Sequence, residues 1–149
     1  MDPRIQTGDM LNAIGQHLCD IIEQHPDGTY MYAEVGEGSC EAGVFLDEGQ
    51  QVVYFEPNDE LFDALFDLWA FAEADKKWAV LHYEVKDGTF EARFSYPDQL
   101  DPDESGFDRR ERALLERYGE KPVIYPKQDG NFRTLTLDDF PDEDENPAT

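Results

Sequence analysis

Four polar residues on two neighbouring runs of alternating sequence could carry out acid–base chemistry. His82 and Glu84 lie in the first run, and Glu91 and Arg93 lie in the second. A histidine beside carboxylates can transfer protons near neutral pH. If the runs pair across a turn at 87–88, His82 lies opposite Arg93. We favour a solvated sheet face with cross-strand pairs, because the sequence supplies no nucleophile or pocket beside these residues.

An acidic loop resembles the opening of a calcium-binding EF-hand. Asp101, Asp103 and Ser105 occupy ligand positions one, three and five, and Gly106 occupies position six. The twelfth position requires a bidentate glutamate, but this chain has Arg112 there. The motif therefore fails as a calcium site.

The histidines and cysteines lack the spacing of metal ligands. They are His17, His25, His82, Cys19 and Cys40. Structural zinc sites pair such ligands at short, regular intervals, and none occurs here. We expect two free thiols, and neither a metal nor a cofactor.

The polar residues named first must be positioned by a hairpin. Asp87-Gly88 between two alternating runs is a strong signal for a two-residue turn. The predicted apolar pairs are Val85 with Phe90, Tyr83 with Ala92, and Leu81 with Phe94. The opposite face carries the pairs Glu84 with Glu91 and His82 with Arg93. We expect this outer face to meet water or a partner.

Hydrophobic periodicity predicts the remaining elements. Helices are expected over 9–24 and 59–74, the latter capped by Asn58 or Asp59, and from about Asp108, in a capping box with Glu111, to Gly119. Strands are expected over 29–35, 42–47, 51–56, 77–85 and 89–96, with an extended piece at 121–126 and a short strand at 132–137. The sequence thus predicts an α+β fold, with an antiparallel sheet of about five strands flanked by an N-terminal, a middle and a C-terminal helix. Residues 1–137 form one domain, and 138–149 form an acidic, flexible tail.

Charge limits the possible partners. The 149 residues include 35 Asp or Glu and 12 Lys or Arg, so the formal net charge is −23, and −17 remains for residues 1–137. Repulsion disfavours nucleic acid and anionic membrane surfaces and favours a basic protein partner. No apolar run approaches the roughly 20 residues of a membrane helix, and the N-terminus lacks signal-peptide features. We expect a cytoplasmic protein.

Three strings resemble the YezG-like family of bacterial immunity proteins. They are residues 30–35 (Tyr-Met-Tyr-Ala-Glu-Val), 111–119 (Glu-Arg-Ala-Leu-Leu-Glu-Arg-Tyr-Gly) and 121–126 (Lys-Pro-Val-Ile-Tyr-Pro). Members of this family are antitoxins of polymorphic toxin systems. The resemblance implies a helix-flanked antiparallel sheet, no catalytic residues, and the binding and blocking of a cognate toxin, often a nuclease.

We therefore predict an immunity protein that binds a basic toxin domain through an acidic surface. The residues expected to contact the partner are Asp98, Asp101, Asp103 and Glu104 in the loop before the third helix, with Glu84 and Glu91 on the outer sheet face as second choices. One alternative is a small cytoplasmic enzyme that uses His82, Glu84, Glu91 and Arg93. Another is an acidic regulatory module that binds a basic protein through its tail.

Overall fold

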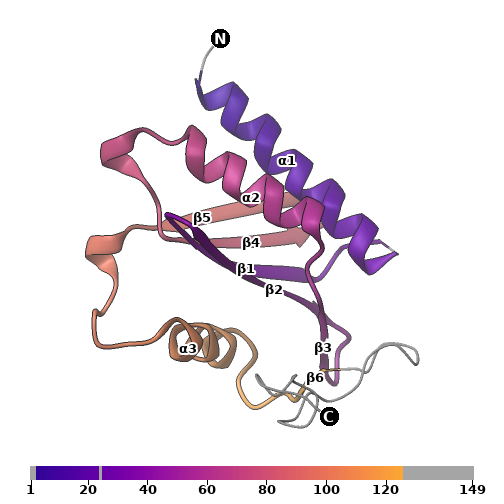
Figure 1. Cartoon of the computed structure of the whole chain (residues 1–149). Coiled ribbons are helices and arrows are strands. Elements are labelled where there is room, and N and C mark those ends of the chain that lie inside the picture. Colours follow the sequence, from indigo (N-terminus) through magenta and orange to yellow (C-terminus); the bar gives the residue numbers. More distant parts are fainter. Residues whose placement is uncertain (1–2, 24, 126–149) are drawn as a thin grey trace, which may run out of the picture.

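The computed structural model describes residues 3–23 and 25–125, which form three α-helices and six strands (Figure 1). In chain order these are α1 (Pro3–Ile22), β1 (Thr29–Gly36), β2 (Ser39–Asp47), β3 (Val52–Phe55), α2 (Asp59–Phe71), β4 (Val80–Lys86), β5 (Thr89–Ser95), α3 (Gly106–Tyr118) and β6 (Val123–Ile124). Short 3-10 turns lie at Ala74–Lys76 and Pro97–Gln99. The expected strand at 132–137 and the acidic tail at 138–149 lie outside the described residues.

One sheet of six strands runs in the order β5-β4-β1-β2-β3-β6. Every pairing is antiparallel except that of β3 with β6, which is parallel. The α+β prediction is confirmed, with six strands in place of about five. The sixth strand is the piece expected only to be extended: Val123 pairs with Val52, and Val52 also donates to the Pro122 carbonyl at 2.8 Å.

The predicted β4–β5 hairpin is confirmed in its register. Val85 pairs with Phe90, and His82 pairs with Arg93. Asp87 and Gly88 both have positive φ, 53° and 79°, as a tight two-residue hairpin turn requires. The sequence signal succeeded because the turn fixes the register of both strands.

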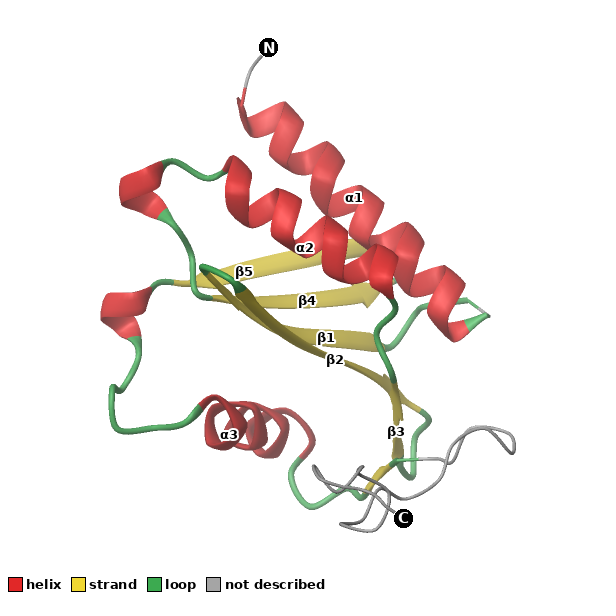
Figure 2. Cartoon of the chain, viewed as in Figure 1, coloured by secondary structure: helices red, strands yellow, loops and turns green. Residues whose placement is uncertain are grey.

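Helices cover both faces of the sheet (Figure 2). α1 and α2 pack side by side on one face, over the inward-facing side chains of β1, β2 and β4. This layer holds the larger core, whose fully buried side chains include Ile14, Leu18, Leu65, Leu81 and Tyr83. α3 lies across the opposite face. Part of the outer face that was expected to meet water or a partner is therefore covered by the chain itself.

α1 and β4 approach each other closely at Gly15. The Tyr83 hydroxyl donates to the Leu11 carbonyl at 2.7 Å. A Cβ added at Gly15 would lie 2.7 Å from that same hydroxyl oxygen. Gly15 therefore allows the buried tyrosine to reach the helix backbone.

We expect Gly15→Ala to lower the free energy of unfolding by about 1–2 kcal/mol through overpacking. Helix propensity alone predicts the opposite sign, since alanine is better than glycine by about 1 kcal/mol in a helix interior. Gly8→Ala is the matched control, because a Cβ at Gly8 of the same helix meets nothing within 4 Å. Urea denaturation measures both variants. A Gly15→Ala protein as stable as wild type would contradict this account of the contact.

Two of the three helix starts differ from expectation. α1 begins at Pro3 rather than residue 9, because its apolar stripe appears only from Met10 and gives no signal for the first turns. α2 begins as expected, with the Asn58 side chain accepting a hydrogen bond from the Leu61 amide. α3 begins at Gly106, with Ser105 as its cap, so Asp108 lies inside the first turn.

A second core lies between α3 and the sheet. Its buried members are Tyr30, Tyr32, Phe45, Val52, Val80 and Leu114. Leu114 is the only buried residue of α3. Burial alone therefore holds α3 weakly, and polar contacts must contribute to its docking.

Candidate functional site

α3 is attached to the sheet by arginines that pair with carboxylates. The Arg109 Nε lies 2.8 Å from the Glu34 carboxylate of β1, and the Arg117 Nη2 lies 2.9 Å from the Glu84 carboxylate of β4. The Arg117 guanidinium also stacks on the Tyr30 ring at 4.5 Å from its centroid. These contacts place the charged face of α3 against the polar face of the sheet.

Glu84 and Glu91, the sheet acids expected to contact a partner, have different surroundings. Glu84 is half-buried and forms the ion pair with Arg117. Glu91 lies directly opposite Glu84 in the ladder, is exposed, and pairs with no cation among the described residues. Only Glu91 keeps the free charge that the sequence analysis expected.

The four acids of the predicted loop also differ in whether they form an ion pair. Both carboxylate oxygens of Glu104 accept from Arg112, at 2.8 and 2.9 Å, and this pair lowers the pKa of Glu104. Asp101 accepts a hydrogen bond from the Asp103 amide at 2.9 Å. Asp98, Asp101 and Asp103 are exposed and form no ion pair within residues 25–125. Glu104 organises the loop, whereas the three aspartates remain available.

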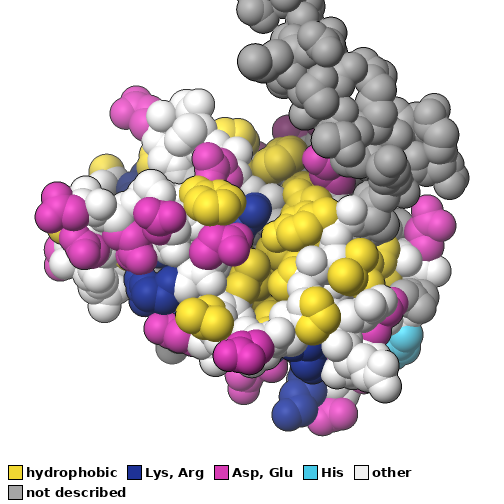
Figure 3. All heavy atoms as spheres, turned by 90° about the horizontal axis from the view of Figure 1, so that it is seen from below, with side chains coloured by type: hydrophobic (Ala, Val, Ile, Leu, Met, Phe, Trp, Pro, Cys, Tyr) yellow, Lys and Arg dark blue, Asp and Glu magenta, His cyan; other side chains and the backbone are white. Residues whose placement is uncertain are grey.

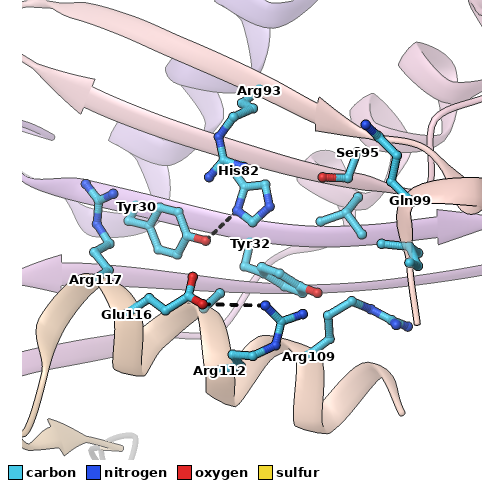
Figure 4. Close-up of a pocket in the computed structure, with 13 residues that line it drawn as sticks. Tyr30, Tyr32, His82, Arg93, Ser95, Gln99, Arg109, Arg112, Glu116 and Arg117 are labelled. Atoms are coloured by element: carbon cyan, nitrogen blue, oxygen red, sulfur yellow. Dashed lines mark hydrogen bonds and ion pairs between the residues drawn. The ribbon is translucent and has the colours of Figure 1, made fainter. Parts of the chain in front are cut away.

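A cavity of about 380 Å³ lies between α3 and the sheet (Figure 4). Its polar lining includes Tyr30, His82, Arg93, Arg109, Arg112, Glu116 and Arg117. Three of these arginines already pair with carboxylates. The cavity thus lies in the polar interface between α3 and the sheet. Most of the positive charge that lines it is neutralised by carboxylates of the chain itself.

The surroundings of His82 do not suit it to proton transfer at neutral pH. Its Nδ1 lies 2.8 Å from the Tyr30 hydroxyl oxygen (Figure 4). Burial, together with the positive charges of Arg93 and Arg117, lowers the pKa of His82 to about 4. Burial raises the pKa of Tyr30 far above its usual range. At pH 7 both groups are neutral, and His82 is a weak base, which favours a structural role.

The lowered pKa of His82 predicts a pH dependence of stability. An unfolded histidine titrates near 6.5 and the folded one near 4, so the unfolded state binds the extra proton between these values. The contribution of neutral His82 is complete above pH 6.5 and is lost as the pH falls toward 4. Because His82 is only half-buried, we expect a loss of about 1–2 kcal/mol.

Urea denaturation of the wild type and His82→Gln at pH 7 and pH 5 measures this effect. The glutamine keeps polar atoms near Tyr30 but does not titrate. The variant should lose less stability than wild type over this interval. Equal losses would show that His82 does not cause the dependence.

The sequence analysis missed a largely buried trio, Tyr32, Glu34 and Arg109, at the start of α3. Glu34 accepts from Arg109 at 2.8 and 3.3 Å and from the Tyr32 hydroxyl. Burial and the Glu34 carboxylate raise the pKa of Tyr32. The only sequence signal was alternation in β1, which places Tyr30, Tyr32 and Glu34 on one face. Alternation does not specify which helix covers that face.

The described residues contain no group of three His, Cys, Asp or Glu side chains that could hold a metal ion. Cys19 and Cys40 are free thiols in α1 and β2. Burial raises the pKa of the Cys40 thiol to about 11. In the described part of the chain, no helix combines the length and hydrophobicity needed to cross a membrane.

Comparison with known proteins assigns no family to the chain. No protein-family model matches the sequence, and no curated protein shows significant similarity to it. The functional assignment therefore depends on the charges and contacts of the described residues.

Proposed function

We propose that this chain is a cytoplasmic immunity protein that neutralises a basic toxin domain by stoichiometric binding. The main supporting observation is that basic and acidic side chains differ in how often they are paired. Within residues 25–125, seven of the nine lysines and arginines have a contact inside the fold, whereas many carboxylates are exposed and form no ion pair. The exposed surface therefore projects strong negative charge.

An acidic surface of this kind suits a partner that binds phosphate. A nuclease is basic where it holds the nucleic-acid backbone. An acidic protein can occupy or shield that surface, and charge complementarity increases the association rate and selects the partner. The resemblance of residues 30–35, 111–119 and 121–126 to immunity proteins supports the same function.

The loop aspartates Asp98, Asp101 and Asp103 are the proposed contact residues. Glu91 is a second candidate on the exposed edge of the sheet. Glu104 and Glu84 are better left intact in a binding test, because each neutralises an arginine of α3. Changing them would disturb the docking of α3 as well as the surface charge.

The proposal predicts a large toxin-like open reading frame directly upstream, and the test uses the toxin domain that it encodes. Co-expression of the wild-type chain should restore growth, and binding should weaken as salt is raised. The triple variant Asp98→Asn, Asp101→Asn, Asp103→Asn should weaken binding about tenfold at low salt. Asparagine keeps the side-chain oxygen of residue 101 that accepts from the residue 103 amide.

Three acids on the helical layer provide the control. Asp20, Asp63 and Asp67 are exposed on α1 and α2, the layer opposite α3, and their conversion to asparagine removes the same charge. This control should change affinity much less. Equal effects of the two triple variants would show that net charge matters but the loop does not. Affinity unaffected by either variant would contradict binding through acidic surface charge.

A further inference from the structure

A second pocket lies where α2, α3 and the sheet meet. It has a volume of about 730 Å³ and lies between the N-terminal ends of α2 and α3. Its wall contains Tyr54 from β3, Phe62 from α2, and Phe107 and Arg110 from α3, with Glu41 of β2 at its edge. We refer to these five residues as the aromatic pocket. None was singled out by the sequence analysis.

Tyr54, Arg110 and Phe107 of the aromatic pocket are connected through the buried Phe45 ring. Tyr54 packs against buried Phe45 with ring centroids 5.5 Å apart, and against Tyr125 at 5.0 Å. The Arg110 guanidinium lies 5.9 Å from the centroids of both Phe45 and Phe107. The pocket is thus supported from the second core, and its aromatic faces already contact one guanidinium.

The α3 side of the molecule exposes unusual apolar area. Phe107 is 63% exposed, Leu115 60%, Tyr125 50% and Ile124 39%. Hydrophobic side chains gather in a band on this side, with acidic side chains around it (Figure 3). An apolar patch with a polar rim is typical of a protein–protein interface, where aromatic residues contribute most to binding.

Charged side chains of both signs line the pocket, namely Glu41, Glu56 and Arg110. Glu41 is exposed and forms no ion pair within residues 25–125. It lies directly across the ladder from Glu34, whose charge is neutralised by Arg109. Glu41 therefore retains its charge for a ligand.

We infer that the aromatic pocket receives a lysine or arginine side chain of the basic toxin domain. The aliphatic stem of that side chain would pack against Phe107 and Tyr54, and its charged end would approach Glu41. This inference rests on the proposed function and names the contact at which the partner is recognised. A purely apolar anchor fits less well, because it would bury Glu41 without a counter-charge.

Single substitutions in the full chain separate the two parts of this contact. Phe107→Leu keeps the apolar volume but removes the aromatic face, and Glu41→Gln removes the charge. Each should weaken binding of the upstream-encoded toxin domain about five- to tenfold. The controls are Tyr96→Leu and Asp20→Asn, an exposed aromatic and an exposed carboxylate elsewhere on the surface. Both should change affinity less than twofold.

A scan of the toxin domain then identifies the occupant. Each lysine and arginine is replaced with methionine, and each variant is measured against wild type and Glu41→Gln. At one position, the methionine variant should bind the wild-type chain about tenfold more weakly than the unmodified toxin domain does. The same substitution should change affinity for Glu41→Gln only slightly, which indicates that the two side chains interact directly. Absence of any coupled position would overturn the inference.

Other outcomes distinguish this inference from the proposed function. Unchanged affinity in both Phe107→Leu and Glu41→Gln, with the loop aspartates still important, would overturn the pocket and leave the immunity function intact. Reduced thermal stability of Phe107→Leu with unchanged affinity would also overturn the inference, because it would show that Phe107 acts within the fold, through contacts such as that with Arg110. A wild-type chain that does not bind the toxin domain would overturn both proposals.

Discussion

Replacing Phe45 with alanine is expected to lower the free energy of unfolding by about 3–5 kcal/mol, the range for a buried aromatic side chain. Phe45 is fully buried at the centre of the second core. Its ring contacts those of Tyr30 and Tyr54, with centroid distances of 6.4 and 5.5 Å. The cavity left by alanine cannot close easily, because these neighbours are fixed on adjacent strands.

The effect should concentrate at the docking of α3. A Cβ at Gly43 would lie 2.9 Å from the Phe45 ring, so the ring occupies space that the neighbouring residue leaves empty. The Arg110 guanidinium of α3 lies over the same ring, 5.9 Å from its centroid. Loss of Phe45 therefore removes support from the sheet and from the helix together.

Urea denaturation gives the total loss, and amide hydrogen exchange locates it. Exchange in α3 should accelerate more than exchange in α1, which packs on the opposite face. Phe45→Leu is the control, because it retains most of the volume and should cost about 1–1.5 kcal/mol. A uniform acceleration across both helices would contradict a local role for Phe45 at α3.

Replacing Arg109 with alanine is expected to cost about 2–3 kcal/mol, because it leaves the Glu34 carboxylate without its cation in a mostly buried position. The Arg109 and Glu34 side chains are only 14% and 20% exposed. Arg109 also donates to the Glu104 carbonyl at 3.2 Å, which ties the acidic loop to α3. One side chain thus joins β1, the loop and the helix.

A double variant tests the charge argument. Arg109→Ala with Glu34→Gln should be more stable than Arg109→Ala alone by about 1 kcal/mol, since a neutral amide needs no cation. Arg112→Ala is the comparison, because Arg112 is 54% exposed and its pair with Glu104 is screened by solvent. It should destabilise much less than Arg109→Ala. A double variant no better than the single one would mean that Arg109 acts through packing alone.

The hairpin shows how much of the fold local sequence can specify. Asp87 and Gly88 adopt the turn that their types favour, and the turn then fixes every cross-strand pair. The β6 strand shows the limit. Only two residues of β6 pair with β3, which is too short a stretch to show a strand pattern in the sequence. The formation of β6 therefore depends on the edge of β3, which is distant in the chain.

The start of α3 shows a different limit. Ser105 and Asp108 both have side chains that can cap a helix, and the sequence analysis selected Asp108. In the structure the Ser105 hydroxyl accepts from the Asp108 amide at 3.0 Å. The two choices differ by less than one helical turn, and tertiary contacts such as that of Arg109 with Glu34 favour the earlier start.

From the sequence, only the net negative charge of the candidate site could be predicted, and not which of its acids remain unpaired. The sequence analysis named six acidic residues, and the structure pairs Glu84 and Glu104 with arginines of α3. It leaves Asp98, Asp101, Asp103 and Glu91 exposed without an ion pair among the described residues. The aromatic pocket has no signature in the sequence, because its walls come from β2, β3, α2 and α3.

By itself, the sequence determined the α+β class, the hairpin register, the start of α2 and the net negative charge, because these follow from neighbouring residues or from composition. Only the tertiary structure decided which carboxylates are neutralised, which face of the sheet α3 covers, and where aromatic side chains remain exposed. Ion pairs and pockets depend on side chains far apart in the chain, such as Glu34 and Arg109. Their proximity is a result of packing that no local pattern encodes.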